Sequence, residues 1–181
     1  ECAPGWTGPA GSCTQCPAGK FKADFGPADC DSCEAGKFKA TSGVNIACDS
    51  CEAGKFKAAG VNTACDSCQA GKYQATVGAT SESDCTSCPG NANAPQGSAA
   101  VSACACNAGY TGANGESCAS CTAGKYKESV GAATCSSCPS DSVSAEGSTS
   151  PSDCIPECAP GWTGPAGSCT QCPAGKFKAD F

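Results

Sequence analysis

The sequence predicts a small, disulfide-rich fold: an elongated tandem array of short disulfide-closed loops with little regular secondary structure, short β-hairpins at most. The first observation is that 21 of the 181 residues are Cys, which is typical of a secreted disulfide scaffold. The second is that Leu, Met, Arg and His are absent and only two Ile occur, so an ordinary core of branched aliphatic side chains cannot form. The third is that internal repeats punctuated by Gly and Pro replace any long 3.6-residue apolar period.

The longest repeat joins the two ends of the sequence. Residues 157–181 repeat residues 1–25 letter for letter, which gives a period of 156 residues. We interpret the chain as one period of a longer tandem array plus the start of the next. Because it opens at Glu1 without a signal peptide, we interpret it as a mature or cut segment.

One period divides into two cassettes. We predict a first cassette at 1–105, a second at 106–156 and the start of the next period at 157–181. Each cassette begins with a G-[WY]-T-G loop, around Trp6 and Tyr110, and ends with a loop that carries a Gly-Ser pair. Between them lie loops of the type C-x-x-G-K-[FY], whose first residues are Cys16, Cys33, Cys51 and Cys68 in the first cassette and Cys121 in the second.

The C-x-x-G-K-[FY] loops share one layout. A glycine follows the first Cys by three residues and a second glycine by nine or ten, which predicts two tight turns with positive φ. The K-[FY]-K stretch between them is expected to be extended, and side chains alternate along extended backbone. We therefore expect the aromatic side chain, such as Phe38, to point onto a disulfide, and the flanking Lys37 and Lys39 to point into solvent.

The cysteines of one period, Cys2 to Cys154, number 18, which is even. Nearest-neighbour pairing uses all of them and encloses one motif in each loop; each closure contributes roughly 3 kcal/mol in the chain-entropy model. An interlocked pattern, such as Cys13–Cys30 with Cys16–Cys33, stays open, since sequence does not fix connectivity. The predicted structural pairs are Cys2–Cys13, Cys16–Cys30, Cys33–Cys48, Cys51–Cys65, Cys68–Cys85, Cys88–Cys104, Cys106–Cys118, Cys121–Cys135, Cys138–Cys154 and Cys158–Cys169.

Zinc binding and redox chemistry are the alternatives for the C-x-x-C joints. C-x-x-C pairs are a zinc-ligand spacing, but one joint is C-x-C at Cys104 and Cys106, and another is C-x-x-x-C at Cys154 and Cys158. A metal site would resist such changes in length, and the cassettes differ in loop number. A thioredoxin-like site needs a single C-x-x-C on a βαβ scaffold. We therefore favour disulfides and expect no metal and no cofactor.

Other function classes are disfavoured by composition. Without His, no Ser-His or Cys-His nucleophile pair and no His metal ligand exists, so we predict that the chain is not an enzyme. A net charge of −6 with scattered lysines makes nucleic acid a poor partner. No apolar run approaches the length of a membrane span. The acids Asp29, Asp31 and Glu34 lack the D-x-D-x-D-G pattern of a calcium loop.

Glycan attachment is restricted to hydroxyl groups. No Asn lies in an N-x-[ST] sequence. The candidate O-glycan sites lie ahead of Pro151, although a plain polar loop explains the stretch equally well. These candidates are Ser142, Ser144, Ser148, Thr149 and Ser150.

The aromatic rings of Trp6 and Tyr110 have two readings. We expect them to cover the next disulfide, as aromatic side chains do in small scaffolds. The alternative is that they form stacking platforms for carbohydrate.

The loops resemble known extracellular modules. The C-x-x-G-K-[FY] loops resemble the first module of tumour-necrosis-factor-receptor cysteine-rich domains. The order Gly-Ser loop, C-x-C-x-x-G-Y-T-G, C-x-x-G-K-Y is similar to the ephrin-receptor-type cysteine-rich repeat, and Cys104-Ala-Cys106 with Cys118 fits the closing half of an EGF-like module. The resemblance implies an extracellular location, secreted or cell-surface, and supports nearest-neighbour pairing. Arrays this regular are also typical of extracellular proteins of algae and other protists.

Two functions fit these observations. The first is a structural repeat protein that self-associates into a filament, as an extracellular fibre or surface appendage, because a polymer benefits from identical units. The alternative is the stalk or ligand-binding ectodomain of a cell-surface receptor or adhesin, which needs a distinct surface in one copy. The likeness to receptor modules alone does not choose between them.

Overall fold

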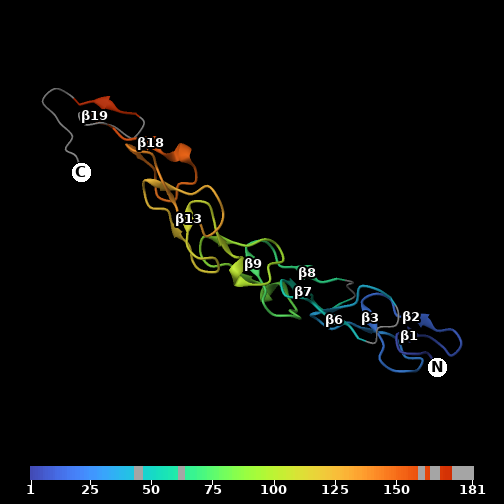
Figure 1. Cartoon of the computed structure of the whole chain (residues 1–181). Coiled ribbons are helices and arrows are strands. Elements are labelled where there is room, and N and C mark those ends of the chain that lie inside the picture. The colour runs from blue at the N-terminus through green and yellow to red at the C-terminus, as the bar shows by residue number, and fades with distance from the viewer. Residues whose placement is uncertain (43–46, 61–63, 159–161, 164–167, 173–181) are drawn as a thin grey trace. The chain divides into compact units, whose positions relative to one another are not determined.

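The computed structural model describes residues 1–42, 47–60, 64–158, 162–163 and 168–172. These residues form two compact units: one contains residues 1–88 and 93–104, and the other residues 89–92 with the described part of 105–181. The described residues contain short strands and 3₁₀ helices and no α-helix (Figure 1). None of the helices in this described part is long and apolar enough to cross a membrane.

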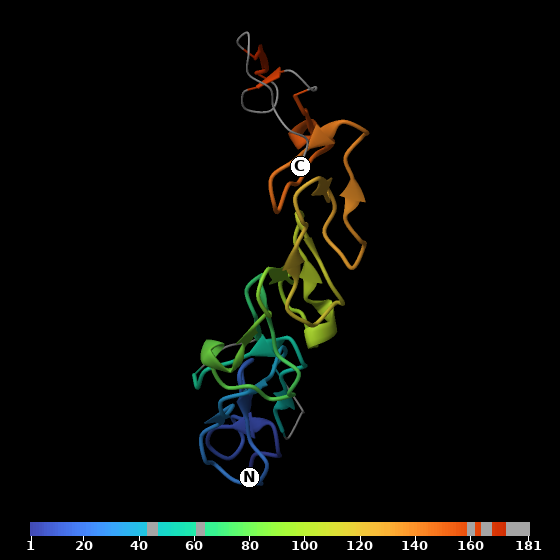
Figure 2. The same cartoon turned by 90° about the vertical axis from the view of Figure 1, so that its left-hand side faces the viewer.

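The strands of the first unit are two residues long and form antiparallel hairpins, β1–β2, β3–β4, β5–β6, β7–β8 and β9–β10. The first strand of a hairpin follows the first glycine of a loop, and the second lies between the two cysteines of the joint. Successive hairpins of this unit follow one another in chain order (Figures 1 and 2). The strands are β1 (Trp6–Thr7), β2 (Thr14–Gln15), β3 (Lys20–Phe21), β4 (Asp31–Ser32), β5 (Lys37–Phe38), β6 (Asp49–Ser50), β7 (Lys55–Phe56), β8 (Asp66–Ser67), β9 (Lys72–Tyr73) and β10 (Thr86–Ser87). Strand β11 (Ala92–Asn93) has one residue in the range of each unit.

The second unit is built in the same way, with hairpins β13–β14, β15–β16, β17–β18 and β19–β20. Its strands are β12 (Ala105–Cys106), β13 (Tyr110–Thr111), β14 (Ala119–Ser120), β15 (Lys125–Tyr126), β16 (Ser136–Ser137), β17 (Ser142–Val143), β18 (Ile155–Pro156), β19 (Trp162–Thr163) and β20 (Thr170–Gln171). The described 3₁₀ helices of the two units are η1 (Glu82–Asp84), η2 (Val101–Ala103) and η3 (Pro151–Asp153). Each precedes the last Cys of its loop.

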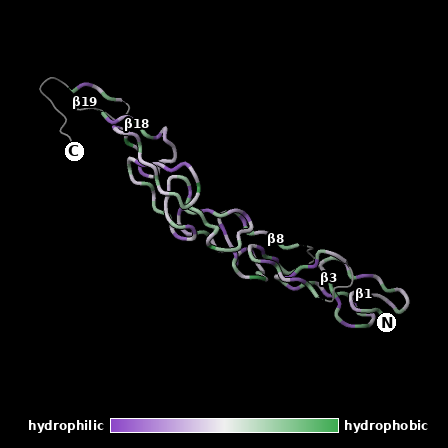
Figure 3. Tube along the Cα trace, in the orientation of Figure 1, coloured by the Kyte–Doolittle hydropathy of each residue, from purple (hydrophilic) through white to green (hydrophobic). Residues whose placement is uncertain are grey.

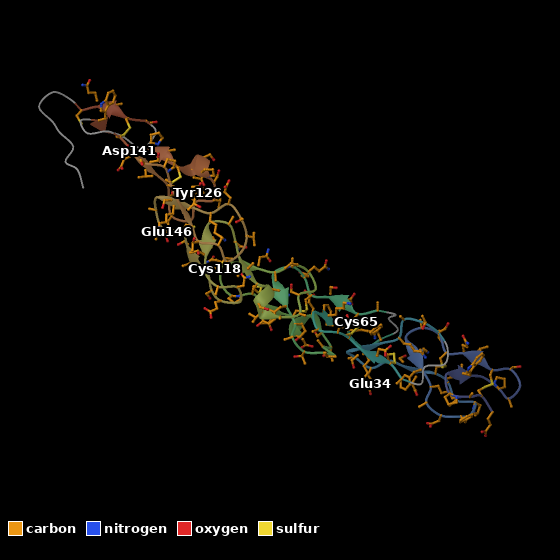
Figure 4. The ribbon with its side chains drawn as sticks, viewed as in Figure 1. Glu34, Cys65, Cys118, Tyr126, Asp141 and Glu146 are labelled. Atoms are coloured by element: carbon orange, nitrogen blue, oxygen red, sulfur yellow. A yellow bond between two sulfur atoms is a disulfide. The ribbon has the colours of Figure 1, made fainter. Side chains whose placement is uncertain are left out.

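Ten disulfides join the cysteines of the described residues, and all ten follow nearest-neighbour order. They are Cys2–Cys13, Cys16–Cys30, Cys33–Cys48, Cys51–Cys65, Cys68–Cys85, Cys88–Cys104, Cys106–Cys118, Cys121–Cys135, Cys138–Cys154 and Cys158–Cys169. Cys65 and Cys118 are labelled in Figure 4, where sulfur is yellow. Cys172, the repeat counterpart of Cys16, has no disulfide partner in the described part of the chain.

The predicted fold class is confirmed: the chain is a disulfide-rich series of short hairpins. Hydrophobic stretches along the trace are short and interrupted by hydrophilic ones (Figure 3). The buried apolar residues of the described chain are almost all half-cystines, with Ala79 and Ala94 as the exceptions. The disulfides therefore occupy the place of a conventional core, and the polar groups around them must find partners.

Candidate functional site

The contacts that recur along this chain lie at the junction between one loop and the next. In the loop closed by Cys33 and Cys48, the Gly36 N–H donates to the Lys57 carbonyl at 2.8 Å, and the Gly36 carbonyl accepts from the Cys51 N–H at 2.8 Å. Both the N–H group and the carbonyl of Gly36 thus bond to the following loop. The same two bonds are made by the first glycine of other loops, with N···O distances of 2.7–3.0 Å: Gly5, Gly19, Gly54, Gly71, Gly109 and Gly124.

These glycines have φ between 75° and 83°, so the predicted left-handed turn is confirmed at the first glycine. L-residues pay a steric cost there. Asn91 and Asp141 hold the equivalent position in the two Gly-Ser loops, at φ 60° and 58°; Asp141 is labelled in Figure 4. Asn and Asp are the side chains that tolerate this conformation best. Their carbonyls also accept backbone bonds, from the N–H groups of Asn107 and Glu157 at 3.0 and 2.8 Å.

The second lysine of each K-[FY]-K stretch in the described part of the chain is buried. The exposed fractions are 4 % for Lys22, 2 % for Lys39, 0 % for Lys57 and 3 % for Lys127. The expectation that both flanking lysines face solvent is therefore wrong for this position. The strands end at the aromatic residue, so alternation does not extend to the second lysine. In a chain without branched aliphatic residues, the four-carbon lysine stem fills the space between loops.

The first lysines behave as expected. Lys37 and Lys55 are half-buried, with 45 % and 41 % of their side chains exposed, and pair with Glu34 and Glu52 at 2.9 and 3.2 Å; Glu34 is labelled in Figure 4. Such exposed pairs contribute little to stability. The Lys37 ammonium donates a hydrogen bond to Glu34 and lowers the pKa of that carboxyl.

Two of the buried ammonium groups, those of Lys22 and Lys127, bond to backbone carbonyls of two loops. Lys127 Nζ donates to the Gly131 carbonyl of its own loop at 2.7 Å, and to the carbonyls of Cys106 and Asn107 in the preceding loop at 3.4 and 3.3 Å. Lys22 repeats this arrangement with the carbonyls of Gly26 and Trp6. Charge-assisted hydrogen bonds of this kind offset part of the cost of burying the cation.

Burial shifts the proton equilibrium of two of these lysines. Desolvation lowers the pKa of Lys39, an effect that the Asp49 carboxylate opposes. Desolvation also lowers the pKa of Lys127. We call the sixth residue after the first Cys of a loop the staple position, because its side chain is placed between two loops.

The staple position is not lysine in every loop. It is Gln74, Ala94 and Ser144 in three loops, and all three residues are buried. Gln74 Nε2 donates to the Asp84 carbonyl at 2.6 Å, and its Oε1 accepts from the Thr76 N–H at 2.8 Å. The neutral amide of Gln74 thus keeps its partners within its own loop, whereas Lys22 and Lys127 also reach the preceding one.

Two of the 3₁₀ helices carry a capping box that sequence reasoning missed. Asp84 Oδ2 accepts from the N–H groups of Thr80 and Ser81 at 2.8 and 3.1 Å, and these two donors lower the pKa of Asp84. Asp153 accepts two equivalent bonds at 2.9 Å ahead of η3. The S-x-S-D-C sequence that precedes the final Cys in both loops is the signal that could have found this cap.

The threonine of the G-[WY]-T-G motif makes a further junction contact. Thr7 Oγ1 donates to an alanine carbonyl of the next loop at 2.9 Å, and Thr111 Oγ1 makes the same contact at 3.2 Å. The neighbouring rings of Trp6 and Tyr110 are half-buried. Their predicted role as covers of a disulfide stays a prediction.

The O-glycan candidates differ in accessibility. Ser144 and Ser148 are buried, and each donates its hydroxyl hydrogen to a backbone carbonyl, at 3.0 and 2.8 Å. Ser142 is half-buried in β17, and Ser150 is the N-cap of η3. Thr149 is the exposed member of the five. O-glycosylation stays a prediction.

No cluster of three or more Cys, Asp or Glu side chains suited to a metal ion occurs among the described residues. The acids considered for calcium, Asp29, Asp31 and Glu34, are therefore not brought together as a ligand set. What the junctions do chemically is hold one loop on the next, through backbone hydrogen bonds and a buried side chain.

Disulfide-closed loops joined by recurring junctions define a cysteine-rich tandem-repeat protein. Residues 40–85 and 109–154, together just over half of the chain, match the family described as tyrosine-protein kinase ephrin type A/B receptor-like. The chain therefore belongs to this family of ephrin-receptor-like cysteine-rich repeats. Comparison with curated proteins gives no match.

Each matched segment ends at the last Cys of a loop with a 3₁₀ helix, Cys85 or Cys154. The predicted ephrin-receptor-type resemblance is confirmed. The likeness to the tumour-necrosis-factor-receptor module, the likeness to the EGF-like module and the likeness to proteins of algae and protists stay predictions. Repeats of this family and ten disulfides point to an extracellular or cell-surface location.

Proposed function

We propose that this chain is a segment of a structural repeat protein that self-associates as an extracellular fibre or surface appendage. One observation carries the proposal: within each unit, loop after loop uses the same pair of glycine hydrogen bonds to hold the next loop. A loop added to such a series meets the same pair of hydrogen bonds as the loop before it. Contacts confined to near neighbours are the property that lets a repeat array grow in one dimension.

The 25-residue repeat supports the same proposal. Hairpin β1–β2 pairs Trp6 with Gln15, and hairpin β19–β20 pairs Trp162 with Gln171. The disulfides of the two copies have Cα–Cα distances of 5.5 and 5.4 Å. The described parts of the copies thus have the same local structure. A constant relation between successive periods would generate an open filament and no closed ring.

The alternative function is the stalk or ligand-binding ectodomain of a receptor or adhesin. The family match favours it, because the family is described as ephrin-receptor-like. A pocket of about 460 Å³ in the loop closed by Cys68 and Cys85 would be the surface to test; Thr76, Thr80, Asp84 and Thr86 are among its lining residues. Hydroxyl and carboxylate groups suit a polar ligand, although the Asp84 carboxylate already caps η1.

Light scattering of an oxidised recombinant chain of several 156-residue periods tests the proposal. We expect the mean mass to rise with protein concentration, because each period adds another set of identical contacts. The same chain, reduced and alkylated, is the control and should not associate in this way. A monodisperse monomer at the highest concentration contradicts the filament and favours the receptor or adhesin stalk.

A further inference from the structure

Apart from the G-[WY]-T-G loops, the loops fall into two classes according to the staple position. Lysine loops carry Lys there: residues 16–30, 33–48, 51–65 and 121–135. The 3₁₀ loops carry Gln74, Ala94 or Ser144 and contain η1, η2 or η3: residues 68–85, 88–104 and 138–154. The first half of loop 68–85 has the lysine-loop sequence C-x-x-G-K-[FY], so the motif with which a loop begins does not decide its class.

The second glycine has a different backbone conformation in the two classes. Its φ is 134°, 145° and 131° in the lysine loops, at Gly26, Gly60 and Gly131. It is 77°, 75° and 75° in the 3₁₀ loops, at Gly78, Gly97 and Gly147. Position 43, the second glycine of loop 33–48, lies outside the described residues.

The N–H group of the second glycine does not distinguish the classes. It donates to the carbonyl of the first Cys of the preceding loop in both, for example from Gly131 to Cys106 and from Gly147 to Cys121, each at 2.8 Å. The difference therefore lies in the carbonyl on the other side of the same residue.

In lysine loops this carbonyl accepts from the ammonium at the staple position. Lys127 Nζ reaches the Gly131 carbonyl at 2.7 Å, and Lys57 Nζ reaches that of Gly60 at 3.3 Å. Lys22 makes the same contact with the carbonyl of Gly26.

In 3₁₀ loops the same carbonyl packs on the first glycine of the loop two places earlier. A Cβ added to Gly109 would lie 2.2 Å from the Gly147 carbonyl oxygen. A Cβ on Gly36 would lie 2.1 Å from the oxygen of Gly78, and one on Gly54 would lie 2.1 Å from that of Gly97. No side chain fits at these distances, which a Cα–H facing a carbonyl accommodates.

The residue after the second glycine adds a backbone bond in the 3₁₀ loops. Its carbonyl accepts from the N–H at the staple position of the preceding loop: Ala79 from Lys57 at 3.0 Å, Ser98 from Gln74 at 3.0 Å and Ser148 from Lys127 at 3.1 Å. A 3₁₀ loop is thus bonded to the loop before it and packed on the loop before that.

The sequence follows the same division. Asn91 and Asp141 are the two first-glycine positions that carry a side chain. Asn91 lies two loops before lysine loop 121–135, and Asp141 lies two loops before the loop that opens at Cys172 and has Lys178 at its staple position by sequence. The first-glycine positions two loops before the three 3₁₀ loops are all Gly.

We propose that the residue at the staple position selects how each loop docks on the two loops before it. Lysine turns the carbonyl of the second glycine to its own ammonium and leaves room for a side chain two loops earlier. Gln, Ala or Ser leaves that carbonyl to pack on the first glycine two loops earlier, which must then remain glycine. One residue per loop, at the staple position, therefore determines how successive loops pack, whichever extracellular function the array serves.

Gly109→Ala and Gly124→Ala form the matched pair that tests the required glycine. Both glycines have φ 78° and lie in the same unit, so the conformational strain of alanine is the same. The added Cβ meets the Gly147 oxygen in the first variant and nothing within 4 Å in the second. We expect hydrogen exchange of the Gly147 and Lys127 amides to speed up at least about tenfold more in G109A than in G124A. Equal exchange in the two variants overturns the proposal.

Ser144→Lys tests the selector itself. Ser144 and Gly147 are three residues apart, as are Lys57 and Gly60 in a lysine loop, so the ammonium can reach the carbonyl. We expect the Gly147 H–N–Hα couplings to change from those of φ near 75° toward those of φ near 130–145°, the values seen in lysine loops. In the S144K background, the acceleration of amide exchange caused by G109A should fall to that caused by G124A. If S144K changes neither the effect of G109A on amide exchange nor the Gly147 couplings, the proposal is overturned.

A second double-mutant cycle, made of K127S and N91G, tests the proposal if S144K does not fold. Lys127→Ser removes the ammonium from a loop that has Asn91 two loops earlier, so the freed Gly131 carbonyl meets a side chain. We expect K127S to speed exchange of the Gly131 amide, and Asn91→Gly to reverse at least about half of that effect on a logarithmic scale. If N91G gives no rescue, the staple position does not act through the first glycine.

Discussion

At the scale of single residues, lysine does the work that leucine or valine does in an ordinary domain. Lys57 is fully buried and Lys39 nearly so. The methylenes of the side chain cover the adjacent loops, and carbonyl oxygens receive the ammonium hydrogens. This arrangement requires backbone carbonyls that are not already hydrogen-bonded. Irregular disulfide loops contain such carbonyls because few of their backbone groups are paired in long strands or helices.

Amine acylation of the folded, oxidised protein separates the two lysines of each K-[FY]-K stretch. We expect Lys37, Lys55 and Lys125 to react and Lys57 and Lys127 to be protected, because Lys125 is exposed and Lys37 and Lys55 are half-exposed, whereas Lys57 and Lys127 are buried. Mass spectrometry after a brief reaction measures the ratio. The reduced, denatured chain is the control and should lose the difference. Equal labelling of Lys125 and Lys127 in the folded protein contradicts the buried staple.

The buried lysines predict an alkaline increase in stability. Burial lowers the pKa of Lys39 and Lys127 in the folded state, whereas the unfolded chain keeps a lysine value of about 10.4. Between these two values the unfolded chain binds more protons, so the free energy of unfolding rises with pH. We expect this rise on going from pH 8 toward pH 10, measured by denaturant unfolding. The measurement uses the Cys172→Ser variant, which removes the unpaired thiol. A K39M/K127M variant in the same background is the control. If the free energy of unfolding falls over this pH range by more than it does in the control, the prediction is contradicted.

The capping carboxylate predicts the opposite behaviour in acid. The N–H groups of Thr80 and Ser81 lower the pKa of Asp84, so its contribution to stability is complete above the unfolded value of about 3.9. That contribution disappears as pH falls through the lower, folded value. We expect the Thr80 and Ser81 amides to exchange faster in acid than the intrinsic rate predicts, and Asp84→Asn to abolish the pH dependence. A carboxyl pKa at or above the unfolded value, measured by NMR, contradicts the cap.

At the scale of the loop, structure could be predicted from sequence where one motif lies within one covalent loop. The glycine turns and the order of the disulfides could be predicted because each is decided within a single short loop, such as the one closed by Cys16 and Cys30. The direction of Lys39 could not, since it depends on the carbonyls of a neighbouring loop and the strand is too short for alternation to apply. Loop 68–85 was grouped with the lysine loops from its first half. Gln74 and the Ser81–Asp84 cap were the signals that place its second half with the Gly-Ser loops.

Removal of one disulfide tests whether a loop is an independent unit. Replacing Cys121 and Cys135 by Ser opens loop 121–135 and should destabilise it by about 3 kcal/mol, the closure entropy of a loop of this length. We expect faster exchange at Gly109 and Gly124, whose N–H groups bond across its two junctions. The amides of hairpin β1–β2 should not change, because contacts are local. Loss of protection throughout both units contradicts a series of separately closed loops.

At the scale of the whole molecule, the account depends on repetition at two levels. The junction contacts repeat from loop to loop, and the first 25 residues repeat after 156. Family membership and disulfide content place the array outside the cell or at its surface. Cassettes at 1–105 and 106–156 remain our proposal for how one period is divided. A fibre uses this regularity in full, whereas a receptor needs only one copy to carry a ligand surface.

Electron microscopy of the purified, unreduced protein with several periods is the most direct test of the fibre. The measurement is the length of single particles as a function of protein concentration. The account predicts continuous filaments that lengthen as concentration rises and show a regular axial repeat set by the 156-residue period. Isolated rods of one fixed length, unchanged up to the highest concentration, would contradict a self-associating structural protein and support a receptor or adhesin stalk.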